Sequence, residues 1–175
     1  MTSYRGTLPA TGVALAGFMG VGKSTVGPLL AARLGLPWWD LDDRIEQRTG
    51  RRIPEIFASD GESGFRHVER LALEAGLSEG AAVVSLGGGA LLDLRARERL
   101  AELGWKTVVL TAPWSEIHDR IRDSGRPLAP FARERMVDRL HHYASLGPSV
   151  DTTGCTPDEV AARAMALVAP KDASE

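Results

Sequence analysis

The sequence predicts an α/β fold in which helices cover both faces of a parallel sheet. Apolar strand-like runs alternate with helical patterns along most of the 175 residues, and a glycine-rich loop joins the first strand to the first helix. Parallel neighbours need crossover connections, which are usually helices, so this alternation favours three α/β/α layers. We expect a single domain over residues 1–175, with its core at about residues 10–168.

The strands are predicted from short apolar runs bounded by glycine, proline or charged residues. Strands buried on both faces are typically continuous apolar runs of this kind. The first contains Val13-Ala14-Leu15-Ala16 and leads directly into the glycine-rich loop. In chain order, the expected strands are residues 11–17, 37–40, 81–86, 106–111 and 150–151.

The helices are predicted from apolar residues at helical spacing and from end signals. The first opens on the glycine-rich loop and ends at Gly35, a plausible C-cap, whereas the last begins at Pro157. A longer helix carries Phe65, Val68 and Leu71 on one face. The expected helices are residues 24–34, 42–49, 54–59, 64–78, 93–103, 115–122, 133–145 and 157–168.

Composition excludes several classes of protein. A net charge of −2 and a pI near 6.1 argue against a broad nucleic-acid-binding surface. No apolar run reaches the ~18 residues that would suggest a membrane span. The single cysteine, Cys155, cannot form an internal disulfide and is interpreted as a bystander without a catalytic role. Residues 1–12 lack the apolar core of a signal peptide. We therefore expect a cytoplasmic protein without nucleic-acid or membrane partners.

Residues 17–24 read G-F-M-G-V-G-K-S, the pattern of a phosphate-binding loop between a strand and a helix. Its glycines let backbone N–H groups face an anion, Lys23 can reach the terminal phosphates, and the Ser24 hydroxyl can ligate Mg²⁺. The chain is therefore predicted to bind ATP or GTP. The residues expected to contact the nucleotide here are Gly20, Val21, Gly22, Lys23, Ser24 and Thr25.

Further polar residues and glycines follow the other predicted strands, where ligands of parallel sheets bind. Asp40 and Asp42 lie at the end of the second strand, where one carboxylate could face a metal ion and the other a substrate hydroxyl. It is equally expected that one of Asp40, Asp42 and Asp43 caps the next helix. The glycines at 87–89 follow the third strand. They indicate either a turn with positive φ or a backbone that approaches a small ligand too closely for any side chain.

Together these motifs resemble shikimate kinase. The resemblance is carried, in order, by Gly17 to Gly27, by Asp40-Leu41-Asp42, by Asp60-Gly61-Glu62 with Phe65-Arg66 and Glu69, by Gly87-Gly88-Gly89, and by Arg126-Pro127-Leu128. It covers about residues 10–168. It implies a nucleoside-monophosphate-kinase-like fold with a five-stranded parallel sheet, and transfer of the γ-phosphoryl of ATP to the 3-hydroxyl of shikimate in aromatic amino-acid and chorismate biosynthesis.

The resemblance also implies roles for single residues. Arg66 and Arg139, the latter within an Arg-x-x-x-Tyr segment, would bind the carboxylate of shikimate, with Glu69 orienting Arg66. Asp42 would accept from the ring hydroxyls and take the proton of the attacking one, and the backbone of Gly87, Gly88 and Gly89 would face the substrate. The metal is assigned to Ser24 and Asp40, and catalysis to Lys23, Asp42 and Arg126.

The lid, at about residues 114–131, departs from the family pattern. Relatives place two basic residues six or seven positions apart before Arg-Pro-Leu, whereas here only three residues separate Arg122 from Arg126. Arg126 is still expected to reach the phosphates on closure, and Arg122 is assigned to adenine or phosphate. Residues 151–157 lack the arginine that relatives often place near adenine.

Two alternatives to shikimate kinase stay open from the sequence. One is another small-metabolite kinase of the same fold, acting on gluconate or an altered cyclitol, which the short lid favours. The other is a non-catalytic nucleotide-binding regulator, which a phosphate loop alone would permit. We further expect a monomer, because residues 133–145 show no heptad seam.

Overall fold

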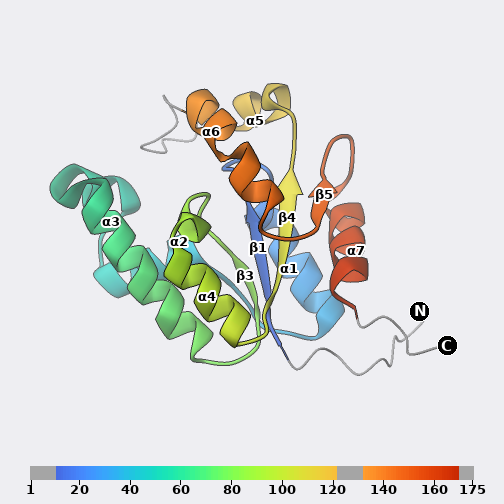
Figure 1. The fold of residues 1–175 in the computed structure, drawn as a ribbon, viewed down its shortest axis with the longest axis horizontal. Helices are drawn as coiled ribbons and strands as arrows, with labels where there is room; N and C mark the ends of the chain where they lie inside the picture. Colours follow the sequence, from blue (N-terminus) through green and yellow to red (C-terminus); the bar gives the residue numbers. More distant parts are fainter. Residues whose placement is uncertain (1–10, 122–131, 170–175) are drawn as a thin grey trace.

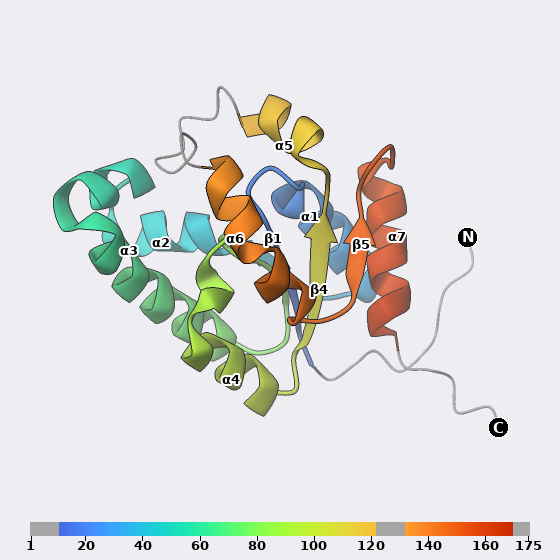
Figure 2. The same ribbon diagram turned by 45° about the horizontal axis from the view of Figure 1, so that its top comes forward.

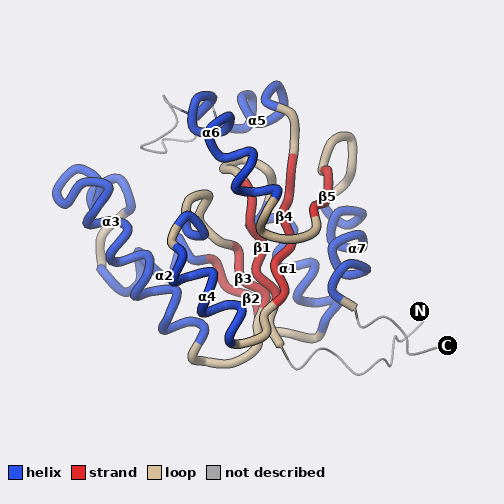
Figure 3. The backbone as a smooth tube through the Cα atoms, in the orientation of Figure 1, coloured by secondary structure: helices blue, strands red, loops and turns tan. Residues whose placement is uncertain are grey.

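The computed structural model describes residues 11–121 and 132–169, which fold around one parallel sheet. Its five strands run in the order β2-β3-β1-β4-β5 (Figure 3). β1 lies in the centre and is buried along its whole length. The strand bounds are β1 Val13–Gly17, β2 Trp38–Asp40, β3 Val83–Ser85, β4 Lys106–Thr111 and β5 Ser149–Asp151.

Helices cover both faces of this sheet. α1 and α7 pack against each other on one face, whereas α4 and α6 cross the other, and α2 and α3 extend beyond the β2 edge (Figures 1 and 2). The helix bounds are α1 Lys23–Leu34, α2 Leu41–Thr49, α3 Ile53–Leu77, α4 Leu94–Glu102, α5 Trp114–Ile121, α6 Ala132–Ala144 and α7 Pro157–Val168, with a 3₁₀ turn η1 at Ala90–Leu92. The predicted α/β/α fold is confirmed.

The predicted elements agree with the observed ones except in one place. The two helices expected at 54–59 and 64–78 are the two parts of α3, which meet at a kink at Gly61, where φ is 69° and ψ is −174°. The turn η1 was not predicted, because three residues are too few to show helical periodicity. Gly35 does cap α1, in the left-handed conformation.

The register of the sheet brings the carboxyl ends of its strands together. Asp40 at the end of β2 pairs with Ser85 at the end of β3, and Gly17 at the end of β1 pairs with Leu110 of β4. The loops that follow these strands therefore share one edge of the sheet. In the described ranges, no helix is long and apolar enough to cross a membrane.

Candidate active site

The loop at residues 17–24 turns sharply between β1 and α1. Gly22 directly precedes α1 with φ of 99°, a left-handed conformation that favours glycine. Its carbonyl accepts from the backbone N–H groups of Thr25 and Val26, at 3.1 and 2.9 Å. The first turn of α1 is thereby fixed, and the N-terminal end of a helix is where an anion binds favourably.

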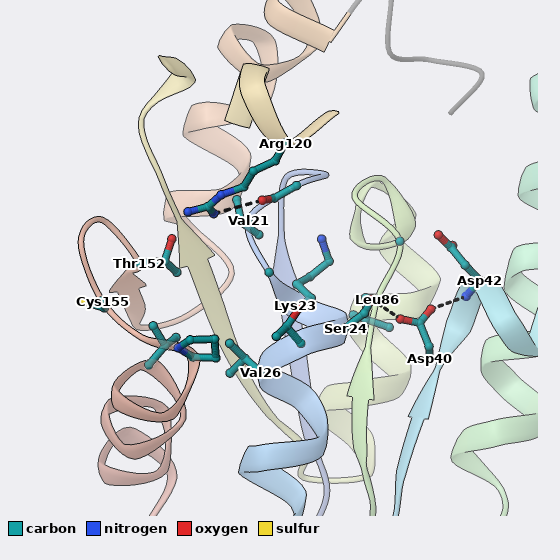
Figure 4. Close-up of a pocket in the computed structure, with 16 residues that line it drawn as sticks. Val21, Lys23, Ser24, Val26, Asp40, Asp42, Leu86, Arg120, Thr152 and Cys155 are labelled. Carbon is teal, nitrogen blue, oxygen red and sulfur yellow. Dashed lines mark hydrogen bonds between the residues drawn. The ribbon is translucent and has the colours of Figure 1, made fainter. Parts of the chain in front are cut away.

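Lys23 lies inside this loop. Its side chain is only 8% exposed, and its Nζ donates to the carbonyl oxygens of Gly17 and Phe18 at 2.9 Å each. Figure 4 shows the ammonium group directed into the loop. The backbone of the loop therefore fixes the lysine charge beside the cavity.

Ser24 and the Asp40–Asp42 segment lie next to each other. The Ser24 hydroxyl donates to Asp40 Oδ2 at 2.5 Å, and Asp40 Oδ1 accepts from the backbone N–H of Asp42 at 2.9 Å (Figure 4). Asp40 is thus the N-cap of α2, which confirms the expected capping role. The same carboxylate keeps one oxygen directed at Ser24.

A hydroxyl and a carboxylate side by side are the hard oxygen donors that Mg²⁺ prefers. Nowhere in the described ranges do three or more His, Cys, Asp or Glu side chains gather as a metal site. With two protein oxygen donors, Ser24 and Asp40 suit a cation that keeps most of its shell as water and phosphate oxygen, which is typical of Mg²⁺ in kinases. These two residues fit the ion.

A cavity of about 460 Å³ opens beside these groups. The phosphate loop, both aspartates and Gly87 form one wall, and Thr152, Cys155, Pro157 and Val160 form the opposite one. Cys155, expected to be a bystander, lines this cavity, although its thiol donates only to backbone carbonyls nearby. Figure 4 shows that the two walls come from opposite sides of β4.

Arg120 also lines this cavity and was overlooked by the sequence analysis. Its Nη1 donates to the carbonyl of Gly20 at 3.2 Å, and its Nη2 pairs with Glu116 at 2.7 Å, one turn earlier in α5 (Figure 4). Arg120 precedes Arg126 by six positions, which is the spacing expected of the family lid, so that spacing was the available signal. Arg122 and Arg126 lie outside the described residues.

Arg139 of α6 lies on the other side of the phosphate loop. It is 6% exposed, and its Nη1 donates to the carbonyl of Gly88 at 3.1 Å. The Tyr143 hydroxyl donates to the same carbonyl. A Cβ placed on Gly88 would lie 3.6 Å from the Gly17 carbonyl oxygen that also accepts from Lys23. Gly88 therefore links the surroundings of Arg139 to the phosphate loop.

Arg66 of α3 is held by Glu69. Its Nη1 donates to Glu69 Oε2 at 2.6 Å, as expected from their spacing in one helix. Glu69 is 4% exposed, and this burial raises the pKa of its carboxyl group while the charge of Arg66 opposes the rise. Among the described residues, the other oxygen, Oε1, is buried without a hydrogen-bond partner. It faces Gly87, as does the carboxylate of Asp42.

The glycines at 87–89 are constrained by space. None of the three has a positive φ, so the interpretation as a left-handed turn is wrong. A Cβ on Gly87 would lie 2.7 Å from Glu69 Oε1, and one on Gly89 would lie 2.5 Å from Arg66 Nη2. Real Cβ atoms do not approach so closely. These two glycines therefore leave the space that the Arg66 and Glu69 side chains occupy, and a larger residue there would displace the ends of those side chains.

Comparisons with known proteins agree on one family. The family model "Shikimate kinase" matches residues 19–169. The chain is 42% identical over 168 residues to a shikimate kinase of Streptomyces coelicolor, covering 92% of this chain and 97% of the relative. It is 43% identical over 157 residues to one of Geobacter metallireducens, covering 86% and 87%.

Solved structures give the same result. A shikimate kinase from Acinetobacter baumannii in complex with shikimate superimposes with a TM-score of 0.85 at 32% identity, covering 92% of this chain and 94% of that one. A gluconokinase from Sinorhizobium meliloti has a TM-score of 0.63 at 22% identity, covering 91% of both chains, a likeness that extends to the fold alone.

Proposed function

We propose a division of roles within this chain, which belongs to the shikimate kinase family and is an ATP-dependent kinase. The family indicated by the sequence motifs is thereby confirmed. The reaction is transfer of the γ-phosphoryl of ATP to the 3-hydroxyl of shikimate, giving shikimate 3-phosphate and ADP. The position of Gly87 and Gly88 is the observation that carries the assignment of roles. Gly87 lines the cavity beside the phosphate loop and lies next to Glu69, the partner of Arg66. Gly88 lies next to the phosphate loop itself and accepts a hydrogen bond from Arg139.

On the nucleotide side, residues Gly20, Val21, Gly22, Ser24 and Thr25 would surround the phosphates. Lys23 would move from its carbonyl partners to the β- and γ-phosphates, where its charge stabilises the transferring group. Arg120 would contact the nucleotide from the α5 side, because it lines the cavity opposite Ser24. Arg126 is proposed to reach the phosphates.

Magnesium would be held by Ser24 directly and by Asp40 through its water ligands. When bound, it would neutralise phosphate charge and orient the terminal phosphoryl group. Asp40 can do this without leaving its place, since its Oδ1 caps α2 and only Oδ2 faces Ser24. The N-cap hydrogen bond thus holds the Asp40 carboxylate where it could contact the water ligands of the metal.

On the acceptor side, Arg66 and Arg139 would bind the shikimate carboxylate. A guanidinium presents paired donors in the plane of a carboxylate, and a charge-assisted hydrogen bond contributes about 1.5–3 kcal/mol. Asp42, which lines the nucleotide cavity and faces Gly87, would accept from the ring hydroxyls and take the proton of the attacking 3-hydroxyl. The backbone of residues 87–89 would face the bound shikimate.

An ADP-release assay over a panel of hydroxy acids tests the acceptor. We expect turnover with shikimate and ATP when Mg²⁺ is present, and only background hydrolysis with gluconate or other cyclitol acids. Turnover with another acid alone would replace shikimate as the acceptor. Absence of turnover with every acid, in a chain that still binds ATP, would favour a regulator.

A further inference from the structure

Glu62 of α3 lies between two arginines that come from different helices. Its Oε1 accepts from Arg66 Nη2 at 3.3 Å and from Arg135 Nη1 of α6 at 3.4 Å. Its Oε2 accepts from Arg135 Nη2 at 3.2 Å. The Glu62 side chain is 43% exposed and both arginines are 27% exposed. One carboxylate thus joins α3 to α6 beside the proposed acceptor site.

The contacts within this cluster are unequal. Arg135 holds Glu62 through two nitrogens, whereas Arg66 holds it through one at 3.3 Å. The pKa of Glu62 is lowered, and the hydrogen bond from Arg135 is the largest cause. Arg66 in turn makes its shorter ion pair, 2.6 Å, with Glu69. Both Arg66 and Glu62 therefore have a stronger partner than each other, and the contact between them is the easiest of the three to displace.

We propose that Glu62 is a displaceable counter-ion of Arg66, and that Arg135 retains Glu62 when an acid acceptor reaches Arg66. This inference rests on the proposed role of Arg66 in binding the shikimate carboxylate. Glu69 occupies Nη1, so the Nη2 donor now directed at Glu62 is the one that the acid would take. Glu62 and Arg135 are positioning residues in this scheme.

The two residues should then affect acid binding in opposite directions. Glu62→Gln removes the competing charge and lowers the Kd for shikimate. Arg135→Gln leaves Glu62 with Arg66 as its ion partner and raises that Kd. Partly exposed ion pairs contribute about 0.2–1 kcal/mol, which corresponds to a change of up to about fivefold in either direction. A merely structural bridge between α3 and α6 would be broken by either substitution, and both would then weaken binding.

The experiment is a double-mutant cycle by titration calorimetry of shikimate into the full chain. The variants are Glu62→Gln, Arg135→Gln, their combination and Arg135→Lys. We expect Arg135→Gln to have no effect in the Glu62→Gln background, and Arg135→Lys to restore most of the affinity. The control is Arg133→Gln, which removes the same charge from an exposed position of α6 and should leave the Kd unchanged.

Four results would overturn the proposal. Equal loss of affinity from Arg135→Gln in both backgrounds would mean that Arg135 contacts the acid itself. Weaker binding in Glu62→Gln would mean that Glu62 supports the acceptor or the helix bridge. If the wild-type chain phosphorylates shikimate but the variants bind it with the wild-type Kd, this inference alone is rejected. If the wild-type chain neither binds nor phosphorylates shikimate, the proposed acceptor is rejected as well.

Discussion

The proposed nucleotide side and the proposed acceptor side of the site are built in different ways. On the nucleotide side, one continuous segment supplies most of the binding groups, and Lys23 is fixed by carbonyls five and six residues away. On the acceptor side, Arg66 and Glu69 of α3 form an ion pair, whereas Arg139 of α6 donates to a backbone carbonyl of the loop at 87–89, whose glycines pack closely against Arg66 and Glu69. Local backbone geometry thus forms one side, whereas tertiary contacts form the other.

This difference predicts separable effects of substitution. Changes in the phosphate loop should affect phosphoryl transfer itself, because its groups meet charge that develops in the transition state. Changes on the acceptor side should mainly affect the affinity for the acid. The following predictions run from the largest expected effect to the smallest.

Lys23→Ala should lower kcat by about 100-fold to 1000-fold, because it removes a fixed positive charge beside the transferring phosphoryl group. The measurement is steady-state kinetics with both substrates saturating, on protein whose melting temperature shows that it is folded. Near-normal turnover in a folded variant would remove Lys23 from the chemistry.

Arg66→Ala should raise the KM for shikimate by about tenfold to 100-fold, because a charge-assisted hydrogen bond contributes about 1.5–3 kcal/mol. The KM for ATP should change little, which makes ATP the internal control. An equal rise in both KM values would show that the two sides are not separable, and an unchanged KM for shikimate would exclude Arg66 from the acceptor site.

Arg120→Ala should raise the KM for ATP by about threefold to tenfold, since Arg120 is partly exposed and its contribution is reduced by solvent. The KM for shikimate should stay the same. Arg95→Ala, at an exposed position of α4, is the matched control. Equal effects of the two substitutions on the KM for ATP would argue against a nucleotide contact at Arg120.

Acidification should lower the stability of the fold through His142 of α6. Its pKa is lowered, first by burial and then by the charge of Arg97. A histidine with a depressed folded pKa costs stability as pH falls below its ordinary value of 6.5, because the unfolded chain takes up the proton first. The melting temperature of wild type should therefore fall more than that of His142→Gln between pH 7 and pH 5. Parallel curves would contradict this assignment.

The sequence predicts much of the fold and the nucleotide side because their signals are local. The apolar runs and the loop at residues 17–24 are contiguous, so the strands, most helices and the position of Lys23 follow from neighbouring residues. The Arg66–Glu69 pair was also accessible, since both residues lie three apart in one helix.

The remaining features depend on contacts between distant segments. The reason for Gly87 and Gly89 was not accessible, because their neighbours are side chains of α3. The bridge from Glu62 to Arg135 joins residues 73 positions apart, which periodicity does not indicate. Arg120 is not indicated for another reason: Arg122 is the nearer arginine before Arg126 in the sequence, whereas Arg120, six positions before Arg126, lines the cavity.

The close approach of Gly89 to Arg66 has an evolutionary consequence. In a lineage that lost Arg66, alanine at position 89 would no longer meet the guanidinium group. Once that methyl group was present, a restored arginine would have to place its guanidinium elsewhere. Loss of acid recognition would then be easier than its recovery, and descendants with new substrates would tend not to revert.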